Sequence, residues 1–236
     1  MKNILDEIPD EYDLTGRFLT SVEFVSDTDI RDKQILDIGC GFGWCEVSFL
    51  KRGARHITGI EISEADLDTI RKNVNDERVT TFVASATRLP FPDESFDTVV
   101  SWEVIEHIPR GAESQMFSEV ARVLKKGGTF YLSTPHLSFW ATMLDPAWWL
   151  LGHRHYSVFQ LVRFARQASL RVEQTLVRGG WWTVLSVLNM YVAKWLFRRS
   201  MFFGADFVHN ENMEYRSTRD GFANIFARFK KGDSAS

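Results

Sequence analysis

A chain of 236 residues, 44% of them hydrophobic, is long enough to bury one full core and to carry an elaboration. A formal net charge of −3 and the lack of a dense Lys/Arg stripe argue against a nucleic-acid partner. The only two cysteines, Cys40 and Cys45, lie close together, so we expect no disulfide framework and a reduced, cytoplasmic location. The acidic first residues lack the apolar core of a secretory leader.

The first half of the chain alternates strand and helix patterns. Residues 1–32 read as a helical lead-in, and residues 34–135 hold apolar strand runs separated by helical segments. The expected strands are 34–38, 56–61, 78–84, 96–102 and 129–133. The expected helices are 43–52, a segment from the N-cap candidate Ser63 to about Asn73, and 112–124, which ends at the stop signal KKGG. The alternation predicts a parallel sheet covered on both faces.

The second half departs from this pattern. Residues 136–156 form an insertion rich in Trp and His, before a helix over 157–168 and a strand over 170–177. Near the end, FANIFARF alternates as a last strand does, and the stretch 179–219 before it is not required by a simple sheet. The expected fold is a single α/β domain. Its sheet would be doubly wound, mostly parallel, seven-stranded and Rossmann-like, with an antiparallel last strand and helical insertions.

The stretch LDIGCGFGWCE places Gly39, Gly41 and Gly43 directly after the first strand. At the carboxyl end of such a strand, free backbone N–H groups and glycine allow a nucleotide-like cofactor to lie against the main chain. The spacing differs from the dinucleotide fingerprint G-x-G-x-x-G, because Trp44 stands where the third glycine is needed. A nicotinamide-linked oxidoreductase is therefore a disfavoured alternative.

The segments LDIGCGFG, GIEIS, LPFPDESFDTVVSWEVIEH and LKKGGTFYLSTP, in this order, resemble class I S-adenosylmethionine-dependent methyltransferases. The closest group is the small-molecule and lipid-quinone type, similar to the ubiquinone-biosynthesis methyltransferases, and the likeness covers roughly residues 34–178. It implies S-adenosylmethionine as cofactor, with Asp37 at its methionine end and Glu61 on the ribose hydroxyls. The implied cofactor contacts are Asp37, Gly39, Cys40, Gly41, Gly43, Glu61, Ile62, Ser85, Ala86 and Trp102.

One position departs from the family pattern. Ser85 stands where the family usually has an acidic residue that accepts a hydrogen bond from the adenine amino group. A serine hydroxyl is shorter and uncharged, but it can still accept. This departure keeps open a rival interpretation, in which the chain binds the cofactor without turnover and serves as a membrane-associated interaction module.

The implied reaction is O- or C-methylation of a small, apolar or lipid-like acceptor. Because the sulfonium is already activated, the protein must align the acceptor and exclude water, and a hydroxyl acceptor also needs a base or a metal. WEVIEHI offers Glu103, Glu106 and His107 as ligands of a hard divalent metal, and similar E-x-x-E-H runs occur in quinone O-methyltransferases. We prefer a strand-to-helix turn here and predict no metal. GHRHYS adds acceptor contacts or bases, so the candidate catalytic residues are Glu106, His107, His153 and His155.

The segment 181–203 is predicted to be an aromatic helix with one broad apolar face, and Lys194 interrupts it. It is slightly short for a membrane span. In one interpretation, which we prefer, it joins 136–156 as a lid over the acceptor site. In the other it makes a peripheral membrane or long-chain acceptor contact, with Lys194, Arg198 and Arg199 at the headgroups. Both interpretations favour an apolar or lipid-like acceptor, and the oligomeric state is left open.

Overall fold

The computed structural model describes residues 14–198, 202–217 and 219–232. In these residues the centre is a seven-stranded sheet with the order β3-β2-β1-β4-β5-β7-β6. Neighbouring strands are parallel, except that β7 runs antiparallel to both β5 and β6. The strands are β1 Gln34–Ile38, β2 His56–Glu61, β3 Val79–Val83, β4 Phe96–Trp102, β5 Leu124–Pro135, β6 Leu170–Arg178 and β7 Asn224–Lys231. The predicted fold class is confirmed, and β1, β2 and β4 have the predicted limits.

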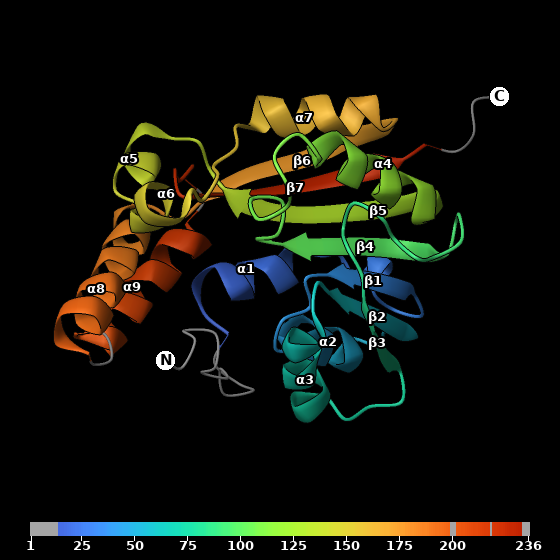
Figure 1. The fold of residues 1–236 in the computed structure, drawn as a ribbon, viewed down its shortest axis with the longest axis horizontal. Helices are drawn as coiled ribbons and strands as arrows, with labels where there is room; N and C mark the ends of the chain where they lie inside the picture. Colours follow the sequence, from blue (N-terminus) through green and yellow to red (C-terminus); the bar gives the residue numbers. More distant parts are fainter. Residues whose placement is uncertain (1–13, 199–201, 218, 233–236) are drawn as a thin grey trace.

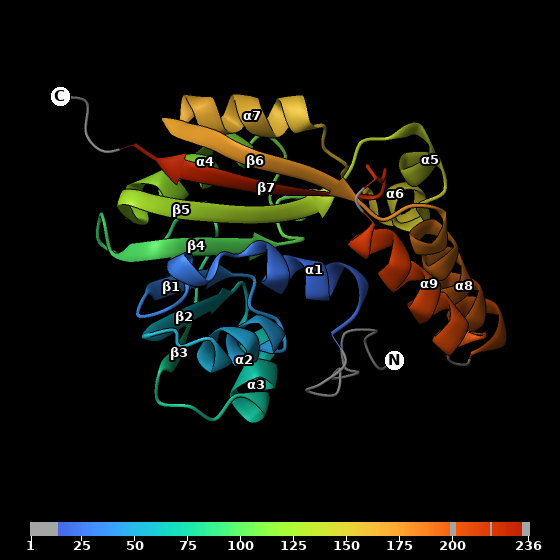
Figure 2. The same cartoon turned by 180° about the vertical axis from the view of Figure 1, so that it is seen from behind.

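Helices cover both faces of this sheet, and four more lie beyond one end of it (Figures 1 and 2). The helices that pack on the sheet are α1 Gly16–Phe24, α2 Trp44–Lys51, α3 Glu64–Asn73, α4 Glu113–Val123 and α7 Val158–Gln167, with a short turn η2 Asp27–Asp29. The helices beyond the end are α5 Phe139–Met143, α6 Pro146–Leu151, α8 Trp181–Phe197 and α9 Gly204–Arg216. Figure 1 shows α5, α6, α8 and α9 at the end to which the arrowheads of β4 and β5 point. The insertions therefore gather at the carboxyl end of the parallel strands.

Hydrophobic clusters fill the space between the sheet and its helices on both faces. Phe49 of α2 packs with Ile35 of β1 on one face, and Phe117 of α4 lies in the cluster with Leu36 of β1 on the other. Successive residues of β1 thus serve different faces, as expected of a parallel strand buried on both sides. The predicted start of α3 is also observed, because Ser63 accepts from the Asp66 N–H at 3.4 Å, as an N-cap does.

The junction between α4 and β5 corrects the sequence prediction. KKGG does not lie between a helix and a later strand, because β5 begins at Leu124, directly after α4, and includes this segment. Leu124 is fully buried and pairs with Phe96, whereas the next pair joins Thr98 to Thr129, so the extra residues form a bulge. Gly127 has φ 68° there. The glycines permit a bulged strand rather than ending a helix at this point.

Helix α8 leaves most of the broad apolar face that its sequence displays exposed. Its buried side chains include the polar Thr183 and Ser186, whereas Trp195 and Leu196 are 66% and 75% exposed. The reason lies in α9, because the Glu214 carboxylate accepts hydrogen bonds from the backbone N–H groups at the start of α8. The polar side of α8 therefore faces α9. None of the described helices combines the length and the apolar character that crossing a bilayer requires.

Candidate functional site

The three glycines after β1 share a backbone conformation but differ in what surrounds them. Gly39, Gly41 and Gly43 have φ values of 82°, 53° and 86°, in the region that favours glycine. A Cβ at Gly39 would lie 2.4 Å from Val104, and one at Gly43 would lie 2.3 Å from Val74. At Gly41, no atom lies within 4 Å of the same point. Gly39 and Gly43 permit close packing of the turn, and Gly41 presents bare main chain to open space.

Beneath this turn lies a pair of buried carboxyl groups, Asp37 and Glu46. Both side chains are buried, and Asp37 Oδ1 and both Glu46 oxygens have no hydrogen-bond partner among the described residues. Burial, and then the charge of Glu61, raises the pKa of Asp37 to about 7. Burial, and then the charge of Asp37, raises the pKa of Glu46 well above its usual value. The pair therefore retains protons at a pH at which exposed carboxyl groups have lost them.

Glu61 connects the end of β2 to the glycine turn. Its Oε1 accepts a hydrogen bond of 2.8 Å from the Gly41 N–H, so the carboxylate is held beside the open glycine. Burial raises its pKa, although the Gly41 N–H opposes the shift. The next residue, Ile62, is 68% exposed. A carboxylate and an exposed apolar side chain thus lie side by side at the carboxyl ends of β1 and β2.

The remaining residues of the predicted cofactor set differ in what their side chains offer. Ser85 lies just past β3, where its Oγ is 2.9 Å from a neighbouring threonine hydroxyl. Ala86 is buried and packs into the core. Cys40 and Trp102 are buried, and the Trp102 Nε1–H donates to Cys45 Sγ at 3.4 Å. For Cys40 and Trp102, contact with a ligand would therefore come from the backbone.

The segment after β4 adjoins the glycine turn, because Val104 packs against Gly39. Glu103, whose backbone has φ 57°, already has hydrogen-bond partners for both carboxylate oxygens. Its Oε1 accepts from Ser133 Oγ at 2.7 Å, and its Oε2 accepts from Asn224 Nδ2 at 3.0 Å. Arg17 of α1 forms an ion pair with the same Oε2 at 3.2 Å. Glu103 is therefore fixed by three other elements and does not join Glu106 and His107 in the way the sequence suggests for a metal site.

The four predicted catalytic residues do meet. His153 Nε2 lies 3.8 Å from Glu106 Oε1, and the rings of His107 and His153 have centroids 5.2 Å apart. Burial, and then the charge of Glu103, raises the pKa of Glu106 well above its usual value. Partial desolvation, and then the neighbouring His153, lowers the pKa of His107. His155 joins the group through Asp145, a residue that the sequence analysis missed.

Asp145 links the two histidines of GHRHYS. Its Oδ2 lies 3.1 Å from His153 Nδ1 and 2.9 Å from His155 Nε2. Burial alone would raise its pKa, but the bonds from the two rings hold the pKa of this carboxyl well below its usual range. The sequence did carry a signal for the cap that Asp145 forms on α6, because Asp-Pro is typical of a helix start. Glu46 was missed as well, since a carboxylate in the first turn of a helix is ordinarily a dipole charge.

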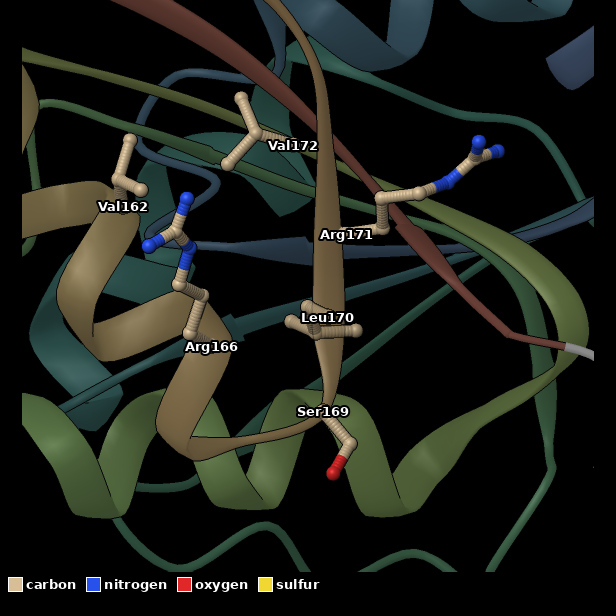
Figure 3. Close-up of a pocket in the computed structure, with 6 residues that line it drawn as sticks. All are labelled: Val162, Arg166, Ser169, Leu170, Arg171 and Val172. Carbon is tan, nitrogen blue, oxygen red and sulfur yellow. The ribbon is translucent and has the colours of Figure 1, made fainter. Parts of the chain in front are cut away.

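A separate surface hollow of about 540 Å³ lies between α7 and β6 (Figure 3). It is lined by Val162, Arg166, Ser169, Leu170, Arg171 and Val172. β6 begins there, so the hollow is at the amino end of the parallel strands, opposite the glycine turn. None of the predicted site residues lines it.

Comparison with known proteins agrees with this geometry. Residues 35–128 match a family described as a methyltransferase domain. A ubiquinone biosynthesis O-methyltransferase of Neisseria meningitidis serogroup C is 31% identical over 173 residues, which cover 67% of this chain and 71% of that protein. The chain spans about half the length of two other curated relatives, from Mycolicibacterium smegmatis and Haemophilus influenzae (54% and 55%).

Solved structures show the same fold at low sequence identity. An S-adenosylmethionine-dependent methyltransferase from Mesorhizobium loti matches with a TM-score of 0.65 at 18% identity, covering 91% of this chain and 97% of that one. A geranyl diphosphate C-methyltransferase from Streptomyces coelicolor A3(2) matches with a TM-score of 0.62 at 18% identity, covering 91% and 77%. That structure was solved with S-adenosyl-L-homocysteine, Mg²⁺ and geranyl diphosphate.

Proposed function

The chain belongs to the class I S-adenosylmethionine-dependent methyltransferases, and we propose that it transfers the methyl group of this cofactor to a small acceptor. One observation carries the proposal. The bare main chain at Gly41 faces open space, beside a carboxylate that its own N–H holds in place. A cofactor with a ribose and a charged amino-acid end needs such a surface, since the backbone can approach closely and Glu61 can accept from two hydroxyl groups.

The buried carboxyl pair would serve the amino-acid end of the cofactor. Asp37 Oδ1 has no hydrogen-bond partner among the described residues, and the ammonium group of S-adenosylmethionine could supply one. Ile62 and the backbone of Ser85–Ala86 would border the adenine, with the Ser85 hydroxyl as an acceptor. Gly39 and Gly43 would shape the turn, and Cys40 and Trp102 would contact the ligand only through their backbone. These roles are supported by position and burial.

Catalysis would consist mainly of alignment, because the sulfonium supplies the activated methyl group. His107 is the exposed member of the four predicted catalytic residues, and it lies three residues after Val104, which touches the glycine turn. It is the best placed to accept a proton from an acceptor hydroxyl. His153, His155 and Glu106 would position the acceptor and exclude water around it.

We infer an apolar or lipid-like acceptor from the aromatic surface of the insertions 136–156 and 179–219. Trp140 of α5 and Trp181 of α8 lie with ring centroids 5.3 Å apart, and both are exposed. Lys194 and Arg198 lie on the same helix end as the exposed Trp195 and Leu196, an arrangement suited to a lipid headgroup surface. The lid interpretation and the membrane interpretation share this surface.

Two measurements test the proposal. Calorimetry with S-adenosylmethionine and S-adenosylhomocysteine should give heats of binding that Glu61→Ala abolishes. Glu64→Gln, which changes an exposed side chain of α3, should not abolish them. An extract assayed with methyl-labelled cofactor should then gain label in an apolar product. Binding without turnover would support the non-catalytic alternative, and a melting temperature raised by NAD but not by S-adenosylhomocysteine would support the oxidoreductase.

A further inference from the structure

Three donor atoms of the 136–156 insertion meet at one point. Asp145 Oδ2, His153 Nδ1 and His155 Nε2 all lie within 4.8 Å of one another, and the carboxylate oxygen is 3.1 Å and 2.9 Å from the two nitrogens. The side chains of Asp145, His153 and His155 are 14%, 20% and 3% exposed. The cluster is thus largely desolvated and keeps one side partly open.

The backbone fixes these donors in advance. Asp145 uses its other oxygen, Oδ1, to cap α6 by accepting from the Ala147 N–H at 2.9 Å, which turns Oδ2 toward the two rings. His155 is held next to Tyr156, whose backbone pairs with that of His136 beside the end of β5. Preorganised donors of this kind do not pay the ordering cost that a flexible loop would pay on binding.

With neutral rings, hydrogen bonds alone leave one of these contacts unmade. His155 faces oxygen with both ring nitrogens, because Nδ1 is 3.1 Å from the carbonyl oxygen of His136 and Nε2 is 2.9 Å from Asp145 Oδ2. A neutral imidazole has one N–H and can donate to only one of the two. Thr142 Oγ1, at 3.3 Å, can donate to Nδ1, but the contact with the carbonyl is then unmade. A second ring, that of His153, contacts the same Asp145 oxygen at 3.1 Å.

A cation at this point would complete these contacts while both rings stay neutral. It would replace the protons between Asp145 Oδ2 and the two rings, so that each neutral histidine could donate its other N–H outward. His155 would donate to the carbonyl of His136, the outer contact that metal-binding histidines usually make. On the far side of His153, Nε2 points toward Glu106 Oε1 at 3.8 Å, a buried atom with no hydrogen-bond partner among the described residues.

We propose that Asp145, His153 and His155 form a binding site for a divalent transition-metal ion of the Zn²⁺ type. Two imidazoles and one carboxylate are a donor set that such ions prefer, and they leave a further position for water. This set differs from Glu103, Glu106 and His107, where the sequence led us to predict no metal and where Glu103 is held by Arg17, Ser133 and Asn224. The site goes beyond the proposed function and shares His153 and His155 with the proposed acceptor end of it.

The test uses the full chain, stripped of metal with a chelator and kept free of cofactor. Calorimetric titration with Zn²⁺ should show a single high-affinity site, and Co²⁺ should produce visible absorption bands at the same stoichiometry. Loss of an outer-shell partner already costs about 10–100-fold in affinity, so Asp145→Asn and His155→Gln should each weaken Zn²⁺ binding by more than about 100-fold. His209→Gln, on the exposed surface of α9, should leave binding unchanged.

A second comparison separates this site from the neighbouring one. His153 also belongs to a possible donor set with Glu106 and His107. His107→Gln should keep Zn²⁺ affinity if the site is the proposed one. Loss of binding in His107→Gln but not in Asp145→Asn would overturn the proposal, as would the absence of binding by the unmodified chain. If buried His155→Gln fails to fold, the more exposed His153→Gln replaces it, with the melting temperature of each metal-free variant as the check.

Discussion

Gly41 and Gly111 share a left-handed backbone, at φ 53° and 85°, and an empty space where a Cβ would point. Only Gly41 stands at the proposed cofactor turn. Replacing either with Ala should lower the free energy of unfolding by about 1–2 kcal/mol, because a side chain is disfavoured in this conformation. In Gly41→Ala alone, the new methyl group would also occupy ligand space. Overpacking costs about 1–3 kcal/mol, so we expect its dissociation constant for S-adenosylhomocysteine to rise about 10–100-fold by calorimetry. Equal affinities in the two variants would contradict the assignment.

The buried carboxyl pair predicts a dependence of stability on pH. Folding raises the pKa of Asp37 from its ordinary value of 3.8 to about 7, and that of Glu46 is raised as well. Between about pH 4 and pH 7 the folded state holds protons that the unfolded state has lost, so stability falls as pH rises through this window. Urea unfolding of the ligand-free protein should show this slope, and Asp37→Asn combined with Glu46→Gln should flatten it.

The control for this prediction is Asp68→Asn, an exposed carboxylate on α3 whose side chain is 61% accessible. This variant should keep the slope of the unmodified protein. A slope that survives in the double variant would show that other groups dominate the pH dependence, and the unpaired oxygens beneath the glycine turn would then need another explanation.

At the scale of elements, the orientation of α8 depends on one carboxylate of α9. Glu214 accepts from the N–H groups of Gly180, Trp182 and Thr183 at 2.9, 2.9 and 3.0 Å. These are amides that a helix start leaves without intrahelical partners. Loss of a cap costs about 0.5–2 kcal/mol, so Glu214→Ala should lower the stability of α8 by this order and speed hydrogen exchange at its first turn. The stability of Glu214→Gln should lie between that of the unmodified protein and that of Glu214→Ala. Met213→Ala, which changes an exposed side chain of the same helix, should have no effect.

The elements that the sequence predicted well are those with local causes. β1, β2 and β4 are short runs marked by buried Ile, Leu and Val side chains, and Ser63 caps α3 through a contact three residues away. The failures have distant causes. The bulge in KKGG depends on pairing with β4, and the face that α8 buries depends on Glu214, whose contacts reach 31 to 34 residues back along the chain. A helical wheel shows which side of α8 is apolar, but not which side meets α9.

In the candidate site, too, features with local causes were predictable and features with distant causes were not. The parallel sheet brings the carboxyl ends of β1, β2 and β4 together, so order along the chain was sufficient to predict that Glu61 lies beside the glycine turn. For Glu106 and His153, the sequence could predict only that both lie at the same end of the sheet, not that they are in contact. The role of Asp145 was not, because it depends on the path of α6, whose cap turns one oxygen toward both histidines. The cofactor roles themselves stay predictions.

At the scale of the whole molecule, the insertions give one end of the sheet an apolar exterior. Helices α5 and α8 lie beyond the carboxyl ends of the strands, on the same end as the proposed acceptor site (Figure 2). Both helices carry exposed aromatic and aliphatic side chains. Exposed apolar patches of this kind mark surfaces that meet another molecule or a lipid surface. The proposal of a lipid-like acceptor implies that the protein meets it at a lipid surface, with α8 lying in the interface.

This interpretation predicts binding to anionic vesicles that depends on α8. Trp195→Ser combined with Leu196→Ser removes two consecutive side chains that are 66% and 75% exposed. Each buried apolar side chain contributes about 1.5–3 kcal/mol, so co-sedimentation with the vesicles should weaken by at least about tenfold. The matched control is Phe82→Ser combined with Val83→Ser, a consecutive pair on edge strand β3 that is 45% and 49% exposed. If both double variants bind vesicles as the unmodified protein does, α8 is not a membrane contact, and its apolar face must be covered by the acceptor or by a protein partner instead.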